Sequence, residues 1–227
     1  MIVVLAEGAG GDETARLLGS GLRELGEDVV LGAVGTSADE VTDLLAGAEI
    51  ERGPLRAVVL ASAGTAATAK GELAGLDPDQ WLERVELPLQ RTLACFQGTH
   101  RRLAAGGGCL IVLVPTLALV GSSGYTPWAT VAEGQRSLAK AAARAWGHEG
   151  ITVNCVAVPG ALLTSPASGG EPGDDGPDRL GQPSPALEGS PDLGGGVAPV
   201  VASLVSGRWS GVTGATIAVD AGVWMTP

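Results

Sequence analysis

The alternation of short apolar runs with helical stretches is the feature that most constrains this chain. Runs rich in Val, Ile and Leu recur along the sequence, and segments with apolar residues at helical spacing separate them. Such alternation is typical of a parallel β-sheet covered by helices. Ala57–Ala61 is apolar at nearly every position, as expected of a strand that is buried on both faces. The sequence therefore predicts a doubly wound α/β fold.

The element boundaries follow from start and stop signals. Asp77 is a good helix cap, with Pro78 at the first helical position and Gln80 three residues after the cap, which predicts a helix to about Ala104. A kink is expected in it at Pro88. The expected strands are Ile2–Ala6, Asp28–Val34, Ala57–Ala61, Leu110–Val114, Thr152–Val158 and Thr216–Asp220. The other expected helices are Asp12–Leu25, Ala38–Arg52, Pro127–Trp146 and Asp192–Val205.

The chain is expected to form one domain over residues 1–227, because its length suits one α/β core and no linker divides it. The stretch from Thr164 to Asp192 stands apart. It holds six Pro, six Gly, six acidic residues and one Arg, so it has too few apolar residues to build a core of its own. We expect residues 164–192 to form a mobile acidic loop.

The composition argues against several classes of function. The net charge of −11 disfavours nucleic acid and anionic membranes as partners, because both select a basic face. No apolar run approaches the ~20 residues of a membrane span. The first strand directly follows Met1, so no signal peptide is expected. Cys95, Cys109 and Cys155 show no metal-ligand spacing and are expected to be reduced core thiols of a cytoplasmic protein.

Other polar and aromatic residues give weak signals. His100 and His148 fall near predicted helix ends, where solvated histidines are commoner than metal ligands. No Ser–His–Asp arrangement and no metal cluster is visible by spacing, so no metal is expected. The tryptophans are expected in the core or at an interface: Trp81, Trp128, Trp146, Trp209 and Trp224.

Three segments resemble the short-chain dehydrogenase/reductase family. Gly150–Gly160, with the sequence GITVNCVAVPG, is similar to the family's sixth strand and its Pro-Gly turn. Val212–Gly222, VTGATIAVDAG, is similar to the family's C-terminal strand, and Val58–Gly64, VVLASAG, lies where the family's fourth strand ends in Asn-Asn-Ala-Gly. The resemblance covers essentially the whole chain and implies a Rossmann-like fold. Function must still be inferred from the site, because one fold supports many activities.

The turn that would hold the dinucleotide phosphates departs from the family's pattern. The family has three glycines there, so that the backbone can approach a pyrophosphate at a helix N-terminus. In residues 7–14, EGAGGDET, only Gly8 falls on that spacing, and Asp12 and Thr14 hold the other two positions. Glu7, Asp12 and Glu13 place three carboxylates where phosphates would lie, although Asp12 also suits a helix cap. Like charges at ~4 Å repel by ~1 kcal/mol even in water, so we expect no NAD(P) cofactor.

The segment between the second and third expected strands is too short for the family's pattern. Residues 35–55 number 21, whereas two helices of ~11 residues, a strand of ~5 and their loops need roughly 40. One helix–strand unit is therefore expected to be missing, which leaves six strands. The surviving helix leads into GPLR at residues 53–56 and resembles the family's third helix. The lost pair would then be the one that flanks the adenosine pocket.

The catalytic positions of the family are also substituted. In the family a Tyr exchanges the carbonyl proton, a Lys four residues later lowers its pKa, a Ser orients the substrate and an Asn relays protons. The resemblance places these residues at the Tyr, Lys, Ser and Asn positions: Trp128, Ala132, Pro115 and Glu86. An indole N–H exchanges no proton near neutral pH, and Tyr125 has no Lys four residues later. We therefore expect no hydride-transfer site.

Two functions remain open at this point. In the first, the chain is a catalytically inactive subunit that forms a hetero-oligomer with an active dehydrogenase or ketoreductase paralogue, or a homo-oligomer. The resemblance implies association through helices 78–104 and 127–146. The second helix carries small residues that permit close helix approach: Ala129, Ala132, Gly134, Ala139, Ala141, Ala142, Ala143 and Ala145.

In the second function, the chain is a cofactor-independent cyclase, isomerase or dehydratase of a biosynthetic pathway. The vacated substrate cleft would be its site, lined by Glu86, Glu7, Tyr125 and Trp128. A desolvated Glu could act there as an acid or a base. The sequence identifies neither the partner nor the substrate.

Overall fold

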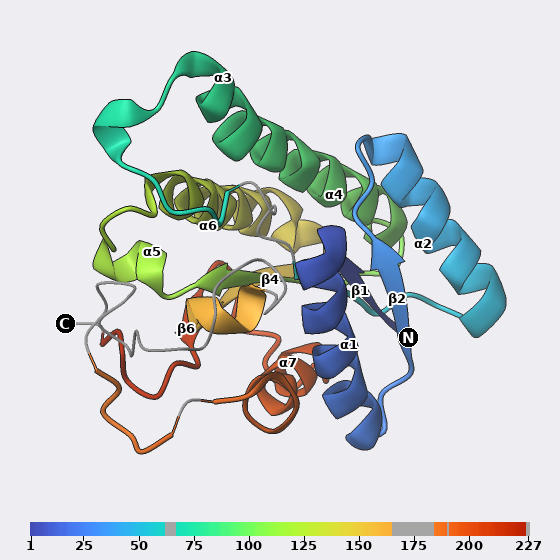
Figure 1. Ribbon diagram of the computed structural model, residues 1–227. Coiled ribbons are helices and arrows are strands. Elements are labelled where there is room, and N and C mark those ends of the chain that lie inside the picture. The colour runs from blue at the N-terminus through green and yellow to red at the C-terminus, as the bar shows by residue number, and fades with distance from the viewer. Residues whose placement is uncertain (62–66, 165–183, 190, 226–227) are drawn as a thin grey trace.

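A six-stranded parallel sheet lies at the centre of the structure, which is a computed structural model (Figure 1). It describes residues 1–61, 67–164, 184–189 and 191–225, and within helix α1 the side chains of residues 8–12 are not described. The strand order is β2-β1-β3-β4-β5-β6, and every pair is parallel. The predicted doubly wound α/β fold with six strands is confirmed.

Each predicted strand is present, within two residues of its expected ends. The strands are β1 (Ile2–Ala6), β2 (Val29–Ala33), β3 (Ala57–Leu60), β4 (Gly108–Pro115), β5 (Ile151–Val158) and β6 (Thr216–Ala218). The last strand is shorter than expected because the chain turns at Asp220. The Asp220 carboxylate accepts hydrogen bonds from the backbone N–H groups of Gly222 and Trp224, both at 3.0 Å.

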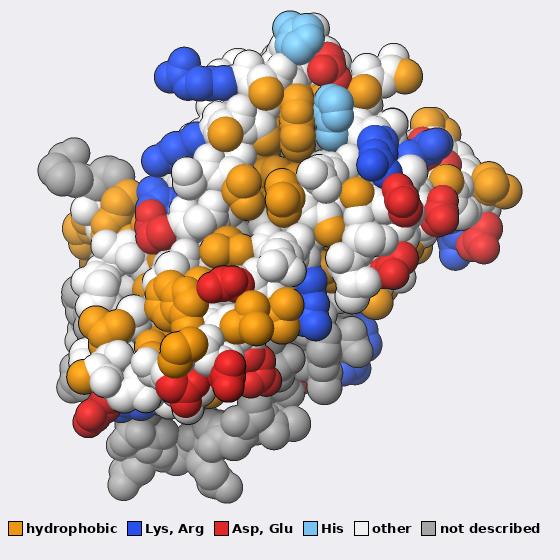
Figure 2. All heavy atoms as spheres, turned by 90° about the horizontal axis from the view of Figure 1, so that it is seen from above, with side chains coloured by type: hydrophobic (Ala, Val, Ile, Leu, Met, Phe, Trp, Pro, Cys, Tyr) orange, Lys and Arg blue, Asp and Glu red, His pale blue; other side chains and the backbone are white. Residues whose placement is uncertain are grey.

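Helices cover both faces of the sheet. α1 (Gly8–Glu24) packs against α7 (Ala198–Val205) on one face, and α2 (Ala38–Arg52), α4 (Leu87–Leu103) and α6 (Thr126–Trp146) pack together on the other (Figure 1). Figure 2 looks down on the side of α4, where hydrophobic patches lie among charged side chains. The short helices are η1 (Leu73–Gly75), α3 (Pro78–Trp81), η2 (Leu82–Glu86), α5 (Leu117–Val120), η3 (Gly147–Glu149), η4 (Gly160–Leu163) and η7 (Leu193–Val197).

The apolar side chains of the strands contribute to two hydrophobic cores, one on each face of the sheet. In β1, Ile2 and Val4 point into the core beneath α1 and α7, whereas Val3 and Leu5 point into the core beneath α2 and α4. Successive side chains of a strand face opposite sides, so a strand covered on both faces must be apolar throughout. Burial of each such side chain contributes about 1.5–3 kcal/mol. The repeated apolar runs therefore determine the three layers.

Helix α2 carries the chain from the edge strand β2 across β1 to β3. It ends up on the face opposite to α1, where it lies against α4. Arg101 pairs with Asp39 at 2.5 Å, and Arg102 Nε donates to Glu49 at 2.8 Å, which ties α4 to α2 at two points. Strand order therefore reverses between β1 and β3. In doubly wound sheets ligands bind outside the carboxyl ends of the strands at such a reversal.

Helix α1 begins four residues before its expected start at Asp12. Glu7 occupies the cap position in an extended conformation, and its side chain accepts no capping hydrogen bond from the first backbone N–H groups of the helix. The expectation that Asp12 caps the helix is therefore wrong. Glycines disfavour a helix by about 1 kcal/mol each, but buried residues such as Leu18 and Leu22 fix α1 on the sheet, and the glycine run continues the helix.

The helix that starts at Pro78 is irregular before Pro88. Its capping box is present, because Gln80 N–H donates to Asp77 at 2.8 Å and the Gln80 side chain accepts from Asp77 N–H at 3.2 Å. A π-helical turn, η2, separates α3 from α4, so the expected irregularity at Pro88 takes the form of a π turn just before it. Pro88 has no N–H for the regular helical bond, and a wide turn before it accommodates that loss.

The predicted mobile acidic loop lies mainly outside the described residues, at 165–183 and 190. Of its described part, Ala186 and Leu187 donate backbone hydrogen bonds to Ala221 O at 2.8 and 3.0 Å. No helix among the described residues is long and apolar enough to span a bilayer.

Replacing Gly98 with Ala should destabilise the fold, because α2 and α4 touch there. A Cβ at Gly98 would lie 2.6 Å from Val41 Cβ. Overpacking costs about 1–3 kcal/mol, which exceeds the helix-propensity gain of up to ~1 kcal/mol. Urea denaturation measures the change. The control is Gly47→Ala on the open side of α2, where a Cβ meets nothing within 4 Å and a gain of about 0.5–1 kcal/mol is expected.

Candidate functional site

The candidate site lies at the carboxyl ends of β1 and β3, where strand order reverses. Glu7 directly follows β1. Residues 62–66, which follow β3, are outside the described residues, and so is the side chain of Asp12. The expected cluster of three carboxylates is thus described only for Glu7 and for Glu13, which is half-buried.

Glu7 is paired with a residue that the sequence did not indicate. The guanidinium of Arg91, on α4, forms an ion pair with the Glu7 carboxylate. The side chain of Glu7 is 13% exposed and that of Arg91 is 39% exposed. No local pattern could have revealed this pair, because only the packing of α4 over the sheet brings Arg91 to the end of β1.

Thr14, at the family's third glycine position, is used inside the fold. It is buried, and its hydroxyl donates a hydrogen bond to Leu162 O at 2.9 Å. That bond ties α1 to η4, which follows β5. The family keeps a glycine at this position for close packing of helix and strand, whereas here a larger side chain holds a neighbouring segment.

Trp128, at the family's Tyr position, is part of the core. It is 1% exposed, and Tyr125 packs against it edge-on with ring centroids 6.2 Å apart. A Cβ added to Gly160 would lie 3.1 Å from both Leu117 Cδ2 and Trp128 Cη2, so the indole fills the space beneath the turn after β5. The Trp128 N–H has no hydrogen-bond partner among the described residues. The ring therefore fills volume rather than facing a cleft.

The residues at the family's Lys, Ser and Asn positions do not form an acid–base site with Trp128. Ala132 is buried in the core beneath α2, α4 and α6, and Pro115 is buried at the end of β4. Glu86 ends the π turn η2 and is exposed. Glu86 is therefore not the desolvated carboxylate that a cofactor-independent acid–base site needs.

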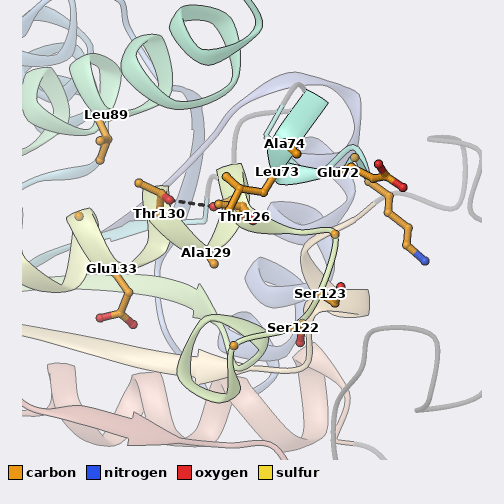
Figure 3. Close-up of a pocket in the computed structure, with 15 residues that line it drawn as sticks. Glu72, Leu73, Ala74, Leu89, Ser122, Ser123, Thr126, Ala129, Thr130 and Glu133 are labelled. Atoms are coloured by element: carbon orange, nitrogen blue, oxygen red, sulfur yellow. Dashed lines mark hydrogen bonds between the residues drawn. The ribbon is translucent and has the colours of Figure 1, made fainter. Parts of the chain in front are cut away.

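A hollow of about 1300 Å³ lies beside this region, between α6, α4 and two loops (Figure 3). Leu73 points toward Thr126 and Thr130, and the Thr130 hydroxyl donates to Thr126 O at 2.8 Å (Figure 3). The lining includes none of the four residues expected to line the vacated cleft: Glu7, Glu86, Tyr125 and Trp128. The structure therefore does not gather them around this hollow.

The lining of the hollow was not anticipated from the sequence. Its polar side chains come from loop residues and from α6. Glu133 is paired with Arg136 at 2.5 Å, and the buried Ser122 hydroxyl has no partner among the described residues. These residues are separated in the sequence and share no motif, so only the fold could reveal them.

The remaining candidate nucleophiles and ligands are structural. Burial raises the pKa of the Cys95 and Cys155 thiols to about 12, so neither is a thiolate near neutral pH. His100 Nε2 lies 2.8 Å from Glu149 Oε2, and its ring stacks on Trp146 with centroids 4.7 Å apart. Within the part of the chain that the structure describes, no three His, Cys, Asp or Glu residues could hold a metal.

Known proteins resemble this chain in sequence and in fold. The family model described as enoyl-(acyl carrier protein) reductase matches residues 9–224. The cis-4-hydroxycyclohexanecarboxylate dehydrogenase of Sinomonas cyclohexanicum is 32% identical over 220 residues, which cover 96% of this chain and 83% of the relative. A 3-oxoacyl-(acyl-carrier-protein) reductase of Staphylococcus aureus is 27% identical over 219 residues, which cover 96% and 86%. Sorbitol-6-phosphate 2-dehydrogenase of Erwinia amylovora has the same fold, with a TM-score of 0.80, 17% identity and coverage of 100% of both chains.

Replacing Trp128 with Ala should cost about 3–5 kcal/mol of folding free energy, as expected for a large buried aromatic side chain. Chemical denaturation measures the loss. The matched control is Trp209→Ala, because Trp209 is 51% exposed and its loss should change stability by no more than about 0.5 kcal/mol. A small effect at Trp128 would instead indicate a ring that lines an open cleft.

Proposed function

The chain belongs to the short-chain dehydrogenase/reductase family, and we propose that within it this protein is a catalytically inactive subunit that pairs with an active dehydrogenase or ketoreductase paralogue. The burial of Trp128 is the observation that carries the proposal. A family enzyme needs a proton donor at this position that touches the substrate. An indole enclosed by the core can neither reach a substrate nor exchange a proton there.

The residues around the sheet reversal do not fit a nicotinamide dinucleotide. Glu7 brings a negative charge to the end of β1, and Thr14 fills the third glycine position of the phosphate turn. β2 is the edge strand of the sheet, so the outer wall that the family builds beside the adenosine is absent from the described sheet. Together these features support a subunit that does not bind NAD(P).

The helices of the α4 side supply a surface for a partner. Leu82, Leu87 and Leu93 lie on the run from η2 to α4 and are 43%, 37% and 43% exposed. The small residues of α6 were expected to permit close approach of a partner helix. Half of them are instead buried in the chain's own core: Ala132, Ala139, Ala142 and Ala143. The apolar part of this surface therefore comes mainly from the leucines of η2 and α4.

Charges on the same side favour a partner of similar fold. Asp79, Glu83 and Glu86 are exposed at the end where α3 and η2 begin the helical run, and Lys140 and Arg144 are exposed at the far end of α6. Crossover helices of a parallel sheet run in the same direction, so acidic and basic groups lie at opposite ends of this side. In an isologous pair, the acidic end of one subunit faces the basic end of the other.

A cofactor-independent enzyme is the second candidate, and the hollow beside α6 is the observation that favours it. Of its two carboxylates, Glu133 is paired with Arg136 and Glu72 is exposed, so neither is a desolvated, unpaired group. The inactive subunit is therefore the better-supported function.

Purification of the tagged chain from its native host distinguishes the two functions. The proposal expects a stoichiometric family paralogue that carries the Tyr, Lys, Ser and Asn residues, identified by mass spectrometry. Recovery of the chain as a lone homo-oligomer that turns over a substrate without a nicotinamide would support the second candidate.

The purified chain should not bind NAD(H) or NADP(H), because a carboxylate and a threonine occupy the phosphate turn. Titration calorimetry and nicotinamide fluorescence test this, with an active family reductase measured alongside as the positive control. Saturable binding at micromolar cofactor would refute the proposal.

Replacing Leu93 with Glu should weaken association by at least about tenfold, or ~1.4 kcal/mol, because the contact would bury an unpaired charge. Sedimentation equilibrium of the chain, alone and with its partner, gives the dissociation constant. Ile50→Glu is the matched control, since Ile50 is 87% exposed on α2, outside the proposed surface. An equal effect of both substitutions, or a monomer under all conditions, would contradict the proposed surface.

A further inference from the structure

The ion pair between Glu7 and Arg91 crosses the part of the sheet where a ligand would lie. Glu7 follows β1, and Arg91 extends from α4, which covers the opposite face from α1. The two side chains therefore meet above the carboxyl end of β1, next to β3 and at the reversal of strand order. This is the crevice in which doubly wound sheets bind ligands.

The burial of the two side chains is unequal. Glu7 is 13% exposed, so its carboxylate has lost most of its water and needs a positive partner. Arg91 is 39% exposed and keeps contact with solvent. A guanidinium binds carboxylate and phosphate oxygens with the same planar set of donors. The anion next to Arg91 is thus supplied by the chain itself.

We propose that Arg91 is an anion-binding residue and that Glu7 is its internal ligand. The Glu7 carboxylate takes up the guanidinium that a phosphate group would otherwise bind. Phosphate-bearing molecules are therefore excluded while the charged pair is intact. This inference rests on the proposed function, because it explains why the crevice rejects a dinucleotide. It adds that the crevice keeps a cation able to bind phosphate once Glu7 loses its charge.

The test uses the full chain with Glu7→Gln, which keeps the shape of the side chain and removes its charge. Inorganic pyrophosphate and NAD⁺ are the probes, measured by calorimetry and by the shift of the melting temperature. The wild type should bind neither. The variant should bind pyrophosphate saturably and at least about tenfold more tightly than the wild type, and pyrophosphate should raise its melting temperature. NAD⁺ shows whether the crevice also admits a dinucleotide or only the free phosphate group.

Two further variants distinguish an effect of the Glu7–Arg91 pair from an effect of the protein's overall charge. Glu7→Gln combined with Arg91→Gln should lose the binding that Glu7→Gln gains. Glu24→Gln removes an exposed carboxylate at the last residue of α1, outside the pair and outside the proposed partner surface, and should gain no binding. If Glu7→Gln does not fold by circular dichroism, Glu7→Ser replaces it in every arm.

The outcomes are distinguishable from those of the proposed function. If the wild type binds no cofactor and Glu7→Gln gains no pyrophosphate binding, the pair only ties β1 to α4 and this inference is overturned. A gain that persists without Arg91 also overturns it. Binding of NAD⁺ by the wild type would instead overturn the proposed function.

Discussion

The short connection between β2 and β3 is the constraint on which the rest of the structure depends. It leaves room for one helix, so α2 must cross β1 and pack on the face of α4. The crossing makes β2 an edge strand and puts the reversal of strand order between β1 and β3. It also requires the close approach of Gly98 to Val41, where a larger side chain has no space. The short connection thus leaves β2 with no further strand on its outer side in the described sheet, while the core stays closed.

The sequence predicted the elements whose signals are local or are fixed by burial. The strands were predicted because most of their positions are apolar, as expected of strands that are covered on both faces. The capping box at Asp77 and Gln80 was found because its two hydrogen bonds join residues three apart. The six-stranded sheet followed from a residue count, because 21 residues between strands cannot hold helix, strand and helix. These features need no knowledge of which elements meet in space.

The features that the sequence did not reveal depend on contacts between distant segments. α1 starts at Gly8 because packing on the sheet outweighs the weak helix propensity of glycine. The partner of Glu7 is Arg91 because α4 packs over the sheet, and no spacing connects the two residues. The hollow beside α6 is lined from separate loops and helices. Sequence reasoning identified substituted positions, such as Trp128, but it could not determine whether they face a cleft or the core.

The residues at three of the family's catalytic positions contribute to packing in this protein, whereas α4 exposes apolar side chains at the surface. Active sites contain buried polar groups that lower the stability of the folded state, and these groups are retained because catalysis needs them. Here Pro115, Trp128 and Ala132 are buried and fill the core, although the Trp128 N–H has no hydrogen-bond partner among the described residues. Leu87 and Leu93 are among the large apolar side chains that are exposed to solvent, and both lie on α4. An exposed apolar helix side has a physical purpose when another subunit covers it. Three of the four family positions thus pack in the core, and the proposed function assigns the exposed leucines of α4 to the contact with the partner.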